Sequence, residues 1–246
     1  IQTNRDGSAW QLSNFTLEQH AGKQLAARIL ITGEITPQPL TAELTILIPH
    51  LKNMALDLVG ALLGDYKFGN TSVTYDGTIQ ISANNSTFAS HGRLSVKDAV
   101  VSSATRKLPD LPPLTIDASH DCNLNHSRQV IDLNQFNLSV GDGNRKIIDG
   151  RLDKPARLAR DNSTAQSNSE GSPALIVKVN QLDLRLLNLL AGSDGKTNVQ
   201  SGLMEADLTA SIQGNGEQIK ISGPLKLQNV DLVTPGIALA NVAAVQ

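Results

Sequence analysis

The stretch A-L-I-V-K-V-N-Q-L-D-L-R-L-L-N-L-L-A-G, residues 174–192, joins two hydrophobic periods. Its residues 175–179 form a β-branched run, which predicts a strand. From Leu182 onward, leucines recur at i, i+4, i+7 and i+8, which predicts a short amphipathic helix over about residues 182–191. Gly192 is placed to cap that helix. The stretch therefore predicts one strand followed directly by one helix.

An earlier stretch, residues 41–64, repeats this order of elements. A strand is predicted at residues 44–48, and Pro49 is expected to end its hydrogen-bond ladder. Apolar residues at helical spacing then predict a helix over about residues 51–63, which Gly64 ends. Two strand-to-helix units in a chain otherwise patterned as strand indicate one repeated plan.

A glycine recurs at the ends of predicted strands, each time in the pattern apolar-x-Gly-x-apolar or a close variant of it. The copies are I-T-G-E-I around Gly33, S-H-G-R-L around Gly92, I-D-G-R-L around Gly150 and I-S-G-P-L around Gly223. The glycines are 59, 58 and 73 residues apart. The polar segment 160–173 lacks periodicity and is predicted to be a flexible insert, and without it the last spacing also becomes 59.

The same comparison divides the chain into two β-repeat units, residues 1–123 and 124–246, each with one short helix. The run L-S-N-F-T-L at residues 12–17 matches L-N-Q-F-N-L at residues 133–138 in all three apolar positions. Residues 115–125 and 130–140 also alternate apolar and polar side chains, which predicts strands. An internal duplication explains these matches better than chance similarity between strands.

The predicted fold class is mainly β: a curled antiparallel sheet that forms an open groove or an incomplete barrel. Glycine inside a strand usually marks a bulge, a bend or a close backbone approach, so repeated glycines would curl the sheet. The alternative is that these glycines are ordinary turn residues between hairpins of a β-sandwich. Both explanations are compatible with the sequence.

Composition excludes several classes of function. Of the 246 residues 40% are hydrophobic but only 3% are aromatic, so the interior must be aliphatic. A net charge of −2 and the lack of aromatic platforms argue against nucleic acid as a partner. One cysteine rules out an internal disulfide framework, and no apolar run is long enough to span a bilayer. Both ends look like cuts in a longer chain, so an anchor or export signal is expected outside this segment.

The sequence carries no motif for catalysis, and we expect no enzyme activity and no cofactor. The nearest approach to a metal site is H-D-C-N-L-N-H, residues 120–126, in which His120 and Cys122 would share one face of a strand. A fourth ligand is not evident beside His126. A polar surface strand explains the same residues, and no metal is predicted.

The glycine pattern, the L-x-x-F-x-L runs and the motif V-N-Q-L-D-L-R-L-L-N-L-L-A-G resemble the AsmA-like family of Gram-negative bacteria, which includes TamB-like and YhdP-like proteins. The resemblance covers most of the chain outside the insert. It implies a periplasmic segment, held at the inner membrane by an N-terminal anchor outside this sequence. It further implies phospholipid as partner, contacts with outer-membrane components, and a role in lipid transport and outer-membrane lipid homeostasis. The missing anchor and the short length depart from the family.

An aliphatic concave surface suffices to bind acyl chains, because each buried CH₂ group contributes about 0.8 kcal/mol without specific polar contacts. The alternative is a structural or adhesive β-repeat module with a closed core and no ligand. The residues expected to line a groove are Ile29, Ile31, Ile46, Ile48, Ile79, Ile81, Leu94, Val96, Ile147, Val177, Val179, Leu225 and Leu227.

Overall fold

The computed structural model describes most of the chain in twelve segments. They are residues 2–3, 8–52, 55–57, 60–61, 66–82, 86–103, 112–143, 145–159, 173–190, 198–213, 218–234 and 237–242. Nearly all of them are strands, so the prediction of a mainly β chain is confirmed. The predicted insert at 160–173 lies outside the described residues, apart from Pro173.

The strands are β1 (Gln2–Thr3), β2 (Trp10–Ala21), β3 (Gln24–Pro37), β4 (Leu40–Lys52), β5 (Tyr66–Lys67), β6 (Ser72–Ile81), β7 (Thr87–Ala99), β8 (Ser102–Ser103), β9 (Leu114–Asn125), β10 (Val130–Gly141), β11 (Lys146–Leu152), β12 (Ala156–Ala159), β13 (Ala174–Asp183), β14 (Asn198–Gln213), β15 (Gln218–Ser222), β16 (Leu225–Thr234) and β17 (Ile237–Val242). A 3-10 helix, η3 (Leu184–Leu186), and a short α-helix, α2 (Leu187–Leu190), follow β13.

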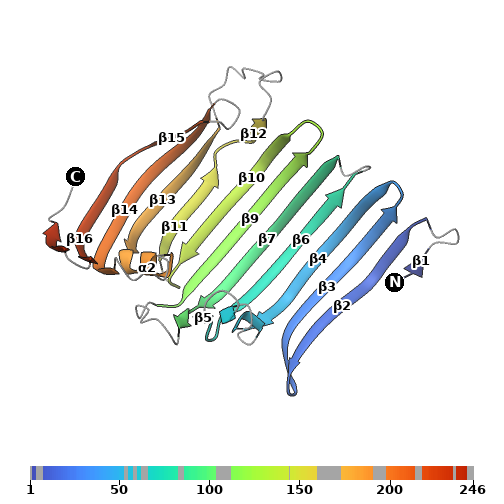
Figure 1. The fold of residues 1–246 in the computed structure, drawn as a ribbon, viewed down its shortest axis with the longest axis horizontal. Coiled ribbons are helices and arrows are strands. Elements are labelled where there is room, and N and C mark those ends of the chain that lie inside the picture. Colours follow the sequence, from blue (N-terminus) through green and yellow to red (C-terminus); the bar gives the residue numbers. More distant parts are fainter. Residues whose placement is uncertain are drawn as a thin grey trace.

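One 15-stranded antiparallel sheet contains almost all of these strands (Figure 1). Its order is β1-β2-β3-β4-β6-β7-β9-β10-β11-β13-β14-β16-β17, while β12 pairs with β10, and β15 pairs with β14. The strands in this order are consecutive along the chain, except that β5, β8, β12 and β15 are skipped. Among the described strands the sheet is not closed into a barrel, and β5 and β8 form a separate pair.

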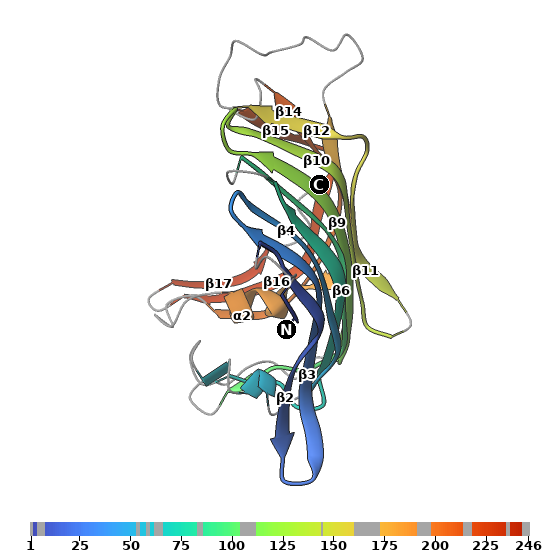
Figure 2. The same cartoon turned by 90° about the vertical axis from the view of Figure 1, so that its right-hand side faces the viewer.

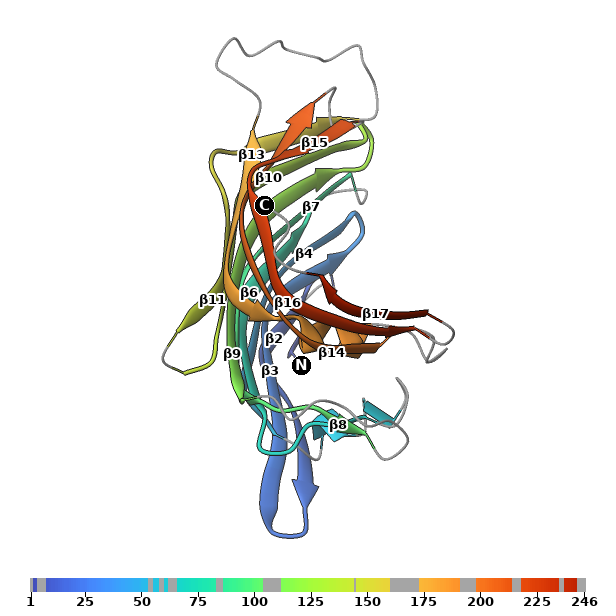
Figure 3. The same cartoon turned by 90° about the vertical axis from the view of Figure 1, so that its left-hand side faces the viewer.

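The sheet is bowed, as the two side views show (Figures 2 and 3). The helix α2 and the pair β5–β8 lie on its concave side, near the ends of the strands drawn at the bottom of Figure 1. The curled, unclosed sheet expected from the sequence is therefore present. The predicted division at residues 123 and 124 falls inside β9, which pairs with β7 on one side and β10 on the other. The duplication of two units stays a prediction.

The register of the strands gives the sheet one apolar and one polar face. Directly paired residues share a face, and one row of paired residues crosses eight strands as Ile48, Tyr75, Leu94, Ala118, Leu138, Gly150, Val177 and Leu208. The neighbouring row on the other face runs Thr74, Ser95, Asp117, Ser139, Asp149, Lys178 and Asp207. These rows define the apolar face and the polar face.

The apolar face is the concave one, because η3 packs on it. Leu184 is 5% exposed and clusters with Val199 and Val230. Leu186 packs against a second buried cluster that includes Val179 and Ala206, which are direct partners on the apolar face. The short helices therefore cover one end of an oily, concave surface.

Two predicted element bounds are corrected. The strand predicted to stop at Pro49 continues to Lys52, because a bulge between Ile48 and Leu51 takes up the proline, which has no N–H to donate. The helix predicted from residue 51 therefore begins later; of its residues, 55–57 and 60–61 are described and helical. Likewise β13 extends to Asp183, so helical structure begins at Leu184 rather than at residue 182.

The recurring glycines are strand residues in three of four cases. Gly33, Gly92 and Gly150 lie inside β3, β7 and β11, so they are not turn residues between hairpins. Gly223 separates β15 from β16. Gly33 and Gly223 have φ angles of 143° and 133°, and a Cβ atom on either would overlap a backbone carbonyl oxygen of the neighbouring strand. These two positions admit only glycine without strain.

The Gly33→Ala substitution should lower the free energy of unfolding by about 1–3 kcal/mol, because it forces both a disfavoured φ and an overlap with the Glu43 carbonyl oxygen. Gly150→Ala is the matched control, since the atom nearest to a Cβ placed at Gly150 is the Cβ of Leu138, at 3.6 Å. Urea unfolding of both variants measures the difference. Equal stability of the two variants would contradict the strain assigned to Gly33.

Candidate functional site

The apolar face is only partly covered by protein. Several of its large side chains are strongly exposed, with Trp10 at 45%, Ile131 at 42% and both Ile219 and Ile221 at 66%. A sheet with an apolar face normally buries it against a second layer. The described elements on this side lie at one end of the strands (Figures 2 and 3), so no second layer of described residues covers the rest of this concave apolar face, which we call the trough. Contiguous exposed apolar surface is typical of interaction sites and ligand-binding grooves.

All thirteen predicted groove residues lie on the strands that build this trough. Eleven are at least partly exposed: Ile29, Ile31, Ile46, Ile48, Ile79, Ile81, Leu94, Val96, Val177, Leu225 and Leu227. The register brings them together, for example Ile31 beside Ile46, and Ile48 on the row of Leu94 and Val177. Whether they contact a ligand stays a prediction.

Ile147 and Val179 have another role. Their side chains are only 4% and 6% exposed, and they pack with Leu182 and Ala206 in one core cluster. Ile147 is the extra residue of the bulge where β11 leaves its register with β10, and Val179 lies where η3 folds over the sheet. Both are packing residues rather than lining residues, since the protein's own side chains already fill the space above them.

Sequence reasoning missed further members of the trough. Tyr75, Leu124, Ile131, Leu133 and Leu138 share the apolar face with the predicted residues. The strands of Leu124, Ile131, Leu133 and Leu138 were expected from alternation over residues 115–125 and 130–140, whereas Tyr75 lies outside those ranges. The signal for including those four was therefore present, because alternation predicts a face as well as a strand.

Hydrogen bonds made by the side chains of Asp183 and Asn188 hold the helices η3 and α2 over one end of the trough. The Asp183 carboxylate accepts hydrogen bonds from the backbone N–H and the Nε of Arg185, at 2.9 and 3.0 Å. The Arg185 side chain thereby lowers the pKa of Asp183 below its ordinary value of 3.8. Asn188 donates from Nδ2 to the Val199 carbonyl at 2.8 Å and accepts from the Val199 N–H at 2.9 Å. The amide thus pairs with β14 as a strand would.

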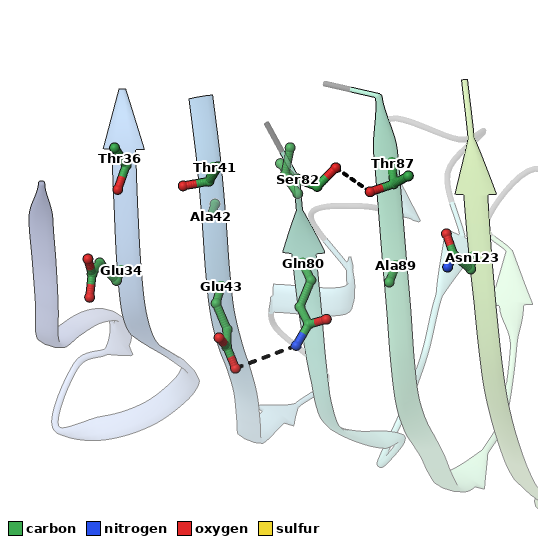
Figure 4. A pocket seen from close by; sticks show the side chains of 11 residues that line it. Glu34, Thr36, Thr41, Ala42, Glu43, Gln80, Ser82, Thr87, Ala89 and Asn123 are labelled. Atoms are coloured by element: carbon green, nitrogen blue, oxygen red, sulfur yellow. Dashed lines mark hydrogen bonds between the residues drawn. The ribbon is translucent and has the colours of Figure 1, made fainter. Parts of the chain in front are cut away.

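The polar face carries cross-strand ion pairs and shallow depressions. Lys178 and Asp207 lie 3.7 Å apart, and Lys226 and Glu205 lie 3.9 Å apart, in both cases as direct partners. One depression of about 580 Å³ is lined mainly by the polar side chains shown in Figure 4. There Gln80 donates to Glu43 at 3.5 Å. The lining includes no basic residue, so this depression is not suited to an anionic ligand.

A second depression on the polar face, of about 710 Å³, spans β4 to β11. Its lining mixes Asp76, Asp117 and Asp149 with Arg93 and Lys146. Charges of both signs alternate along it, as on the rest of this face. Most residues that line the second depression belong to the polar face, and it also borders Ile48, Tyr75 and Leu94 of the apolar row.

The described residues contain no group of three histidine, cysteine or acidic side chains placed to hold a metal ion. His120 and Cys122 do share one face of β9, as the sequence indicated, while His126 lies in the turn after that strand. No helix within the described part of the chain is long and apolar enough to cross a membrane. Comparisons of the chain with family models, curated proteins and solved structures find no match.

The pKa of Asp183 predicts how acid acts on the covered end. Because the folded state lowers this pKa, the carboxylate stabilises the fold at pH values above 3.8, and this contribution is lost as the pH falls through the lowered pKa. Asp183→Asn keeps an acceptor for the Arg185 N–H but cannot ionise. Thermal melts between about pH 2 and pH 6 should therefore show a smaller loss of stability in Asp183→Asn than in the wild type.

Asp76→Asn, which removes an exposed carboxylate from the polar face, controls for the change in net charge. It should follow the wild-type pH profile. Parallel profiles for the wild type and Asp183→Asn would show that this cap does not contribute to acid sensitivity.

Proposed function

We propose that this chain binds phospholipid acyl chains along its apolar face and conducts them as the periplasmic segment of an AsmA-like protein. The observation that carries the proposal is a continuous row of apolar residues across eight strands, on the concave side of a sheet that is not closed into a barrel. The role is non-enzymatic and needs no cofactor. The full-length protein would sit in the periplasm of a Gram-negative bacterium, anchored to the inner membrane outside this segment, and would support outer-membrane lipid homeostasis.

The chemistry of the trough supports an acyl chain as the occupant. The exposed residues are mostly Ile, Leu and Val, and neither a lysine, an arginine nor a carboxylate belongs to the apolar rows of the described strands. A flexible aliphatic ligand needs no directional contact on such a surface. Burying ten CH₂ groups would contribute about 8 kcal/mol before the cost of ordering the chain is subtracted.

The repeat belongs to the same proposal. Two β-repeat units, 1–123 and 124–246, each with a helix after a strand, would extend one trough across their junction in β9. The helices would cover the same end of the strands in both units. A lipid could then pass from one unit to the next without leaving the oily surface.

The competing function is a structural or adhesive module whose apolar face is covered by other protein and takes no ligand. An open trough favours the lipid hypothesis, since the described residues supply a second layer only at one end. Lipid content of the purified chain distinguishes the two functions directly.

Protein purified without detergent should carry phospholipid, detectable by native mass spectrometry and by solvent extraction. Ile79→Asp should reduce bound lipid at least tenfold while the circular dichroism spectrum is unchanged. Ile79 lies on the apolar face between Leu44 and Ser90 and is half-buried, so a carboxylate there would be desolvated by a bound acyl chain.

Thr78→Asp is the matched control, because Thr78 is the preceding residue and lies on the polar face beside Thr45 and His91. It should leave the lipid content unchanged. Lipid-free wild-type protein would refute the proposed function, and equal lipid loss in both variants would show that the apolar face is not the binding surface.

A further inference from the structure

Polar side chains interrupt the apolar face between β6 and β9. Ser90 on β7 and Cys122 on β9 are direct partners, and His120 precedes Cys122 by two residues on the same face. Tyr75 on β6 lies two residues from Gly77, which is level with Gly92 and His120. The rows on either side continue with Ile79, Leu133, Phe136 and Leu138. The interruption is therefore a polar island within the oily surface.

The side chains of this island are organised by contact with one another and with the sheet. Ser90 Oγ and His120 Nε2 are 2.9 Å apart, a hydrogen-bond distance. The Tyr75 hydroxyl lies against both Gly77 and Gly92, where a Cβ atom would overlap it. Since Gly92 is the direct partner of His120, the Tyr75 hydroxyl on Gly92 lies at the neighbouring strand position to His120. The two glycines thus make room for a hydroxyl beside the Ser90–His120 pair.

These groups keep hydrogen-bonding capacity after their mutual contact. An imidazole has a second ring nitrogen, and a serine or tyrosine hydroxyl can both donate and accept. All three side chains are half-buried, so water reaches them while the trough is open. An acyl chain lying over them would remove that water, which costs free energy unless the ligand supplies a polar partner.

We propose that this island, Tyr75, Ser90 and His120, binds the acyl carbonyl oxygen of a lipid whose hydrocarbon chain lies in the trough. The inference rests on the proposed function and adds to it a fixed position for the polar end of the acyl chain. A carbonyl oxygen is the acceptor that neutral hydroxyls can satisfy. A phosphate is disfavoured, because no lysine or arginine belongs to the apolar rows of the described strands, and phosphate sites rely on such cations.

The acyl carbonyl occurs both in the protonated carboxyl group of a fatty acid and in the esters of a phospholipid. Three probes separate these sources from binding by hydrocarbon alone: oleate, dioleoylphosphatidylcholine supplied in vesicles, and hexadecane. Equilibrium binding of each to delipidated full chain would be measured for the wild type, Ser90→Ala, His120→Leu and Tyr75→Phe. Ser119→Ala and His91→Leu, on the polar face of the same two strands, are the matched controls.

Each island variant should bind oleate, dioleoylphosphatidylcholine or both about fivefold more weakly than the wild type, as expected for the loss of one hydrogen bond. Its affinity for hexadecane should be unchanged. Weakening of oleate alone identifies a carboxyl group as the ligand, and weakening of the phospholipid alone identifies an ester. The controls should bind all three probes as the wild type does.

Two results would overturn the inference while leaving the proposed function intact. In the first, the island variants bind both oxygen-containing probes with unchanged affinity. In the second, their affinity for hexadecane falls as much as their affinity for the oxygen-containing probes, which would indicate a purely structural role. Failure of the wild type to bind any of the three probes would instead refute the proposed function itself.

Discussion

The whole structure depends on keeping the two-residue alternation of side chains in register from strand to strand. A slip of one residue between two strands would bring charged groups onto the apolar face and aliphatic groups onto the polar face. The pairs Lys178–Asp207 and Glu205–Lys226 are exposed and contribute little stability individually. Their effect is on register, because a slip would separate the paired charges and move them toward the oily side. The polar face thus specifies the arrangement that the apolar face requires.

At several positions on its concave side the sheet has glycine where a side chain would not fit. Gly33 lets the backbone of β4 approach where any side chain would collide with the Glu43 carbonyl. Gly77 and Gly92 have no side chain, and the Tyr75 ring fills the space above both of them. The end of the trough is closed separately, by η3 packing through Leu184 and by the Asn188 amide bound to β14. The close approach of the strands and the cover at one end therefore depend on different residues.

Much of this arrangement could be predicted from alternation alone, because period and face are the same signal in a strand. The limits of the prediction are equally physical. Pro49 ends a regular ladder, but a bulge accommodates it, and bulges leave no periodic trace in a sequence. The burial of Ile147 and Val179 depends on how η3 folds back, which is a tertiary contact. The Ser90–His120 contact joins residues 30 positions apart and required the register of β7 and β9 to be known.

The uneven exposure of the apolar face has a consequence for the direction in which a bound chain would lie. Exposure rises from 6% at Val179, beneath η3, to 66% at Ile219 on β15. An acyl chain pointing along β13 and β14 would meet the packed cluster under η3 at one end and water at the other. A chain lying across the strands remains on one row, such as that of Leu94, Ala118, Leu138 and Val177, which is interrupted only by Gly150 between Leu138 and Val177. The proposed conduction would therefore run along the order of the strands, perpendicular to their axes. The apolar rows of the described strands contain no charged side chain along this direction.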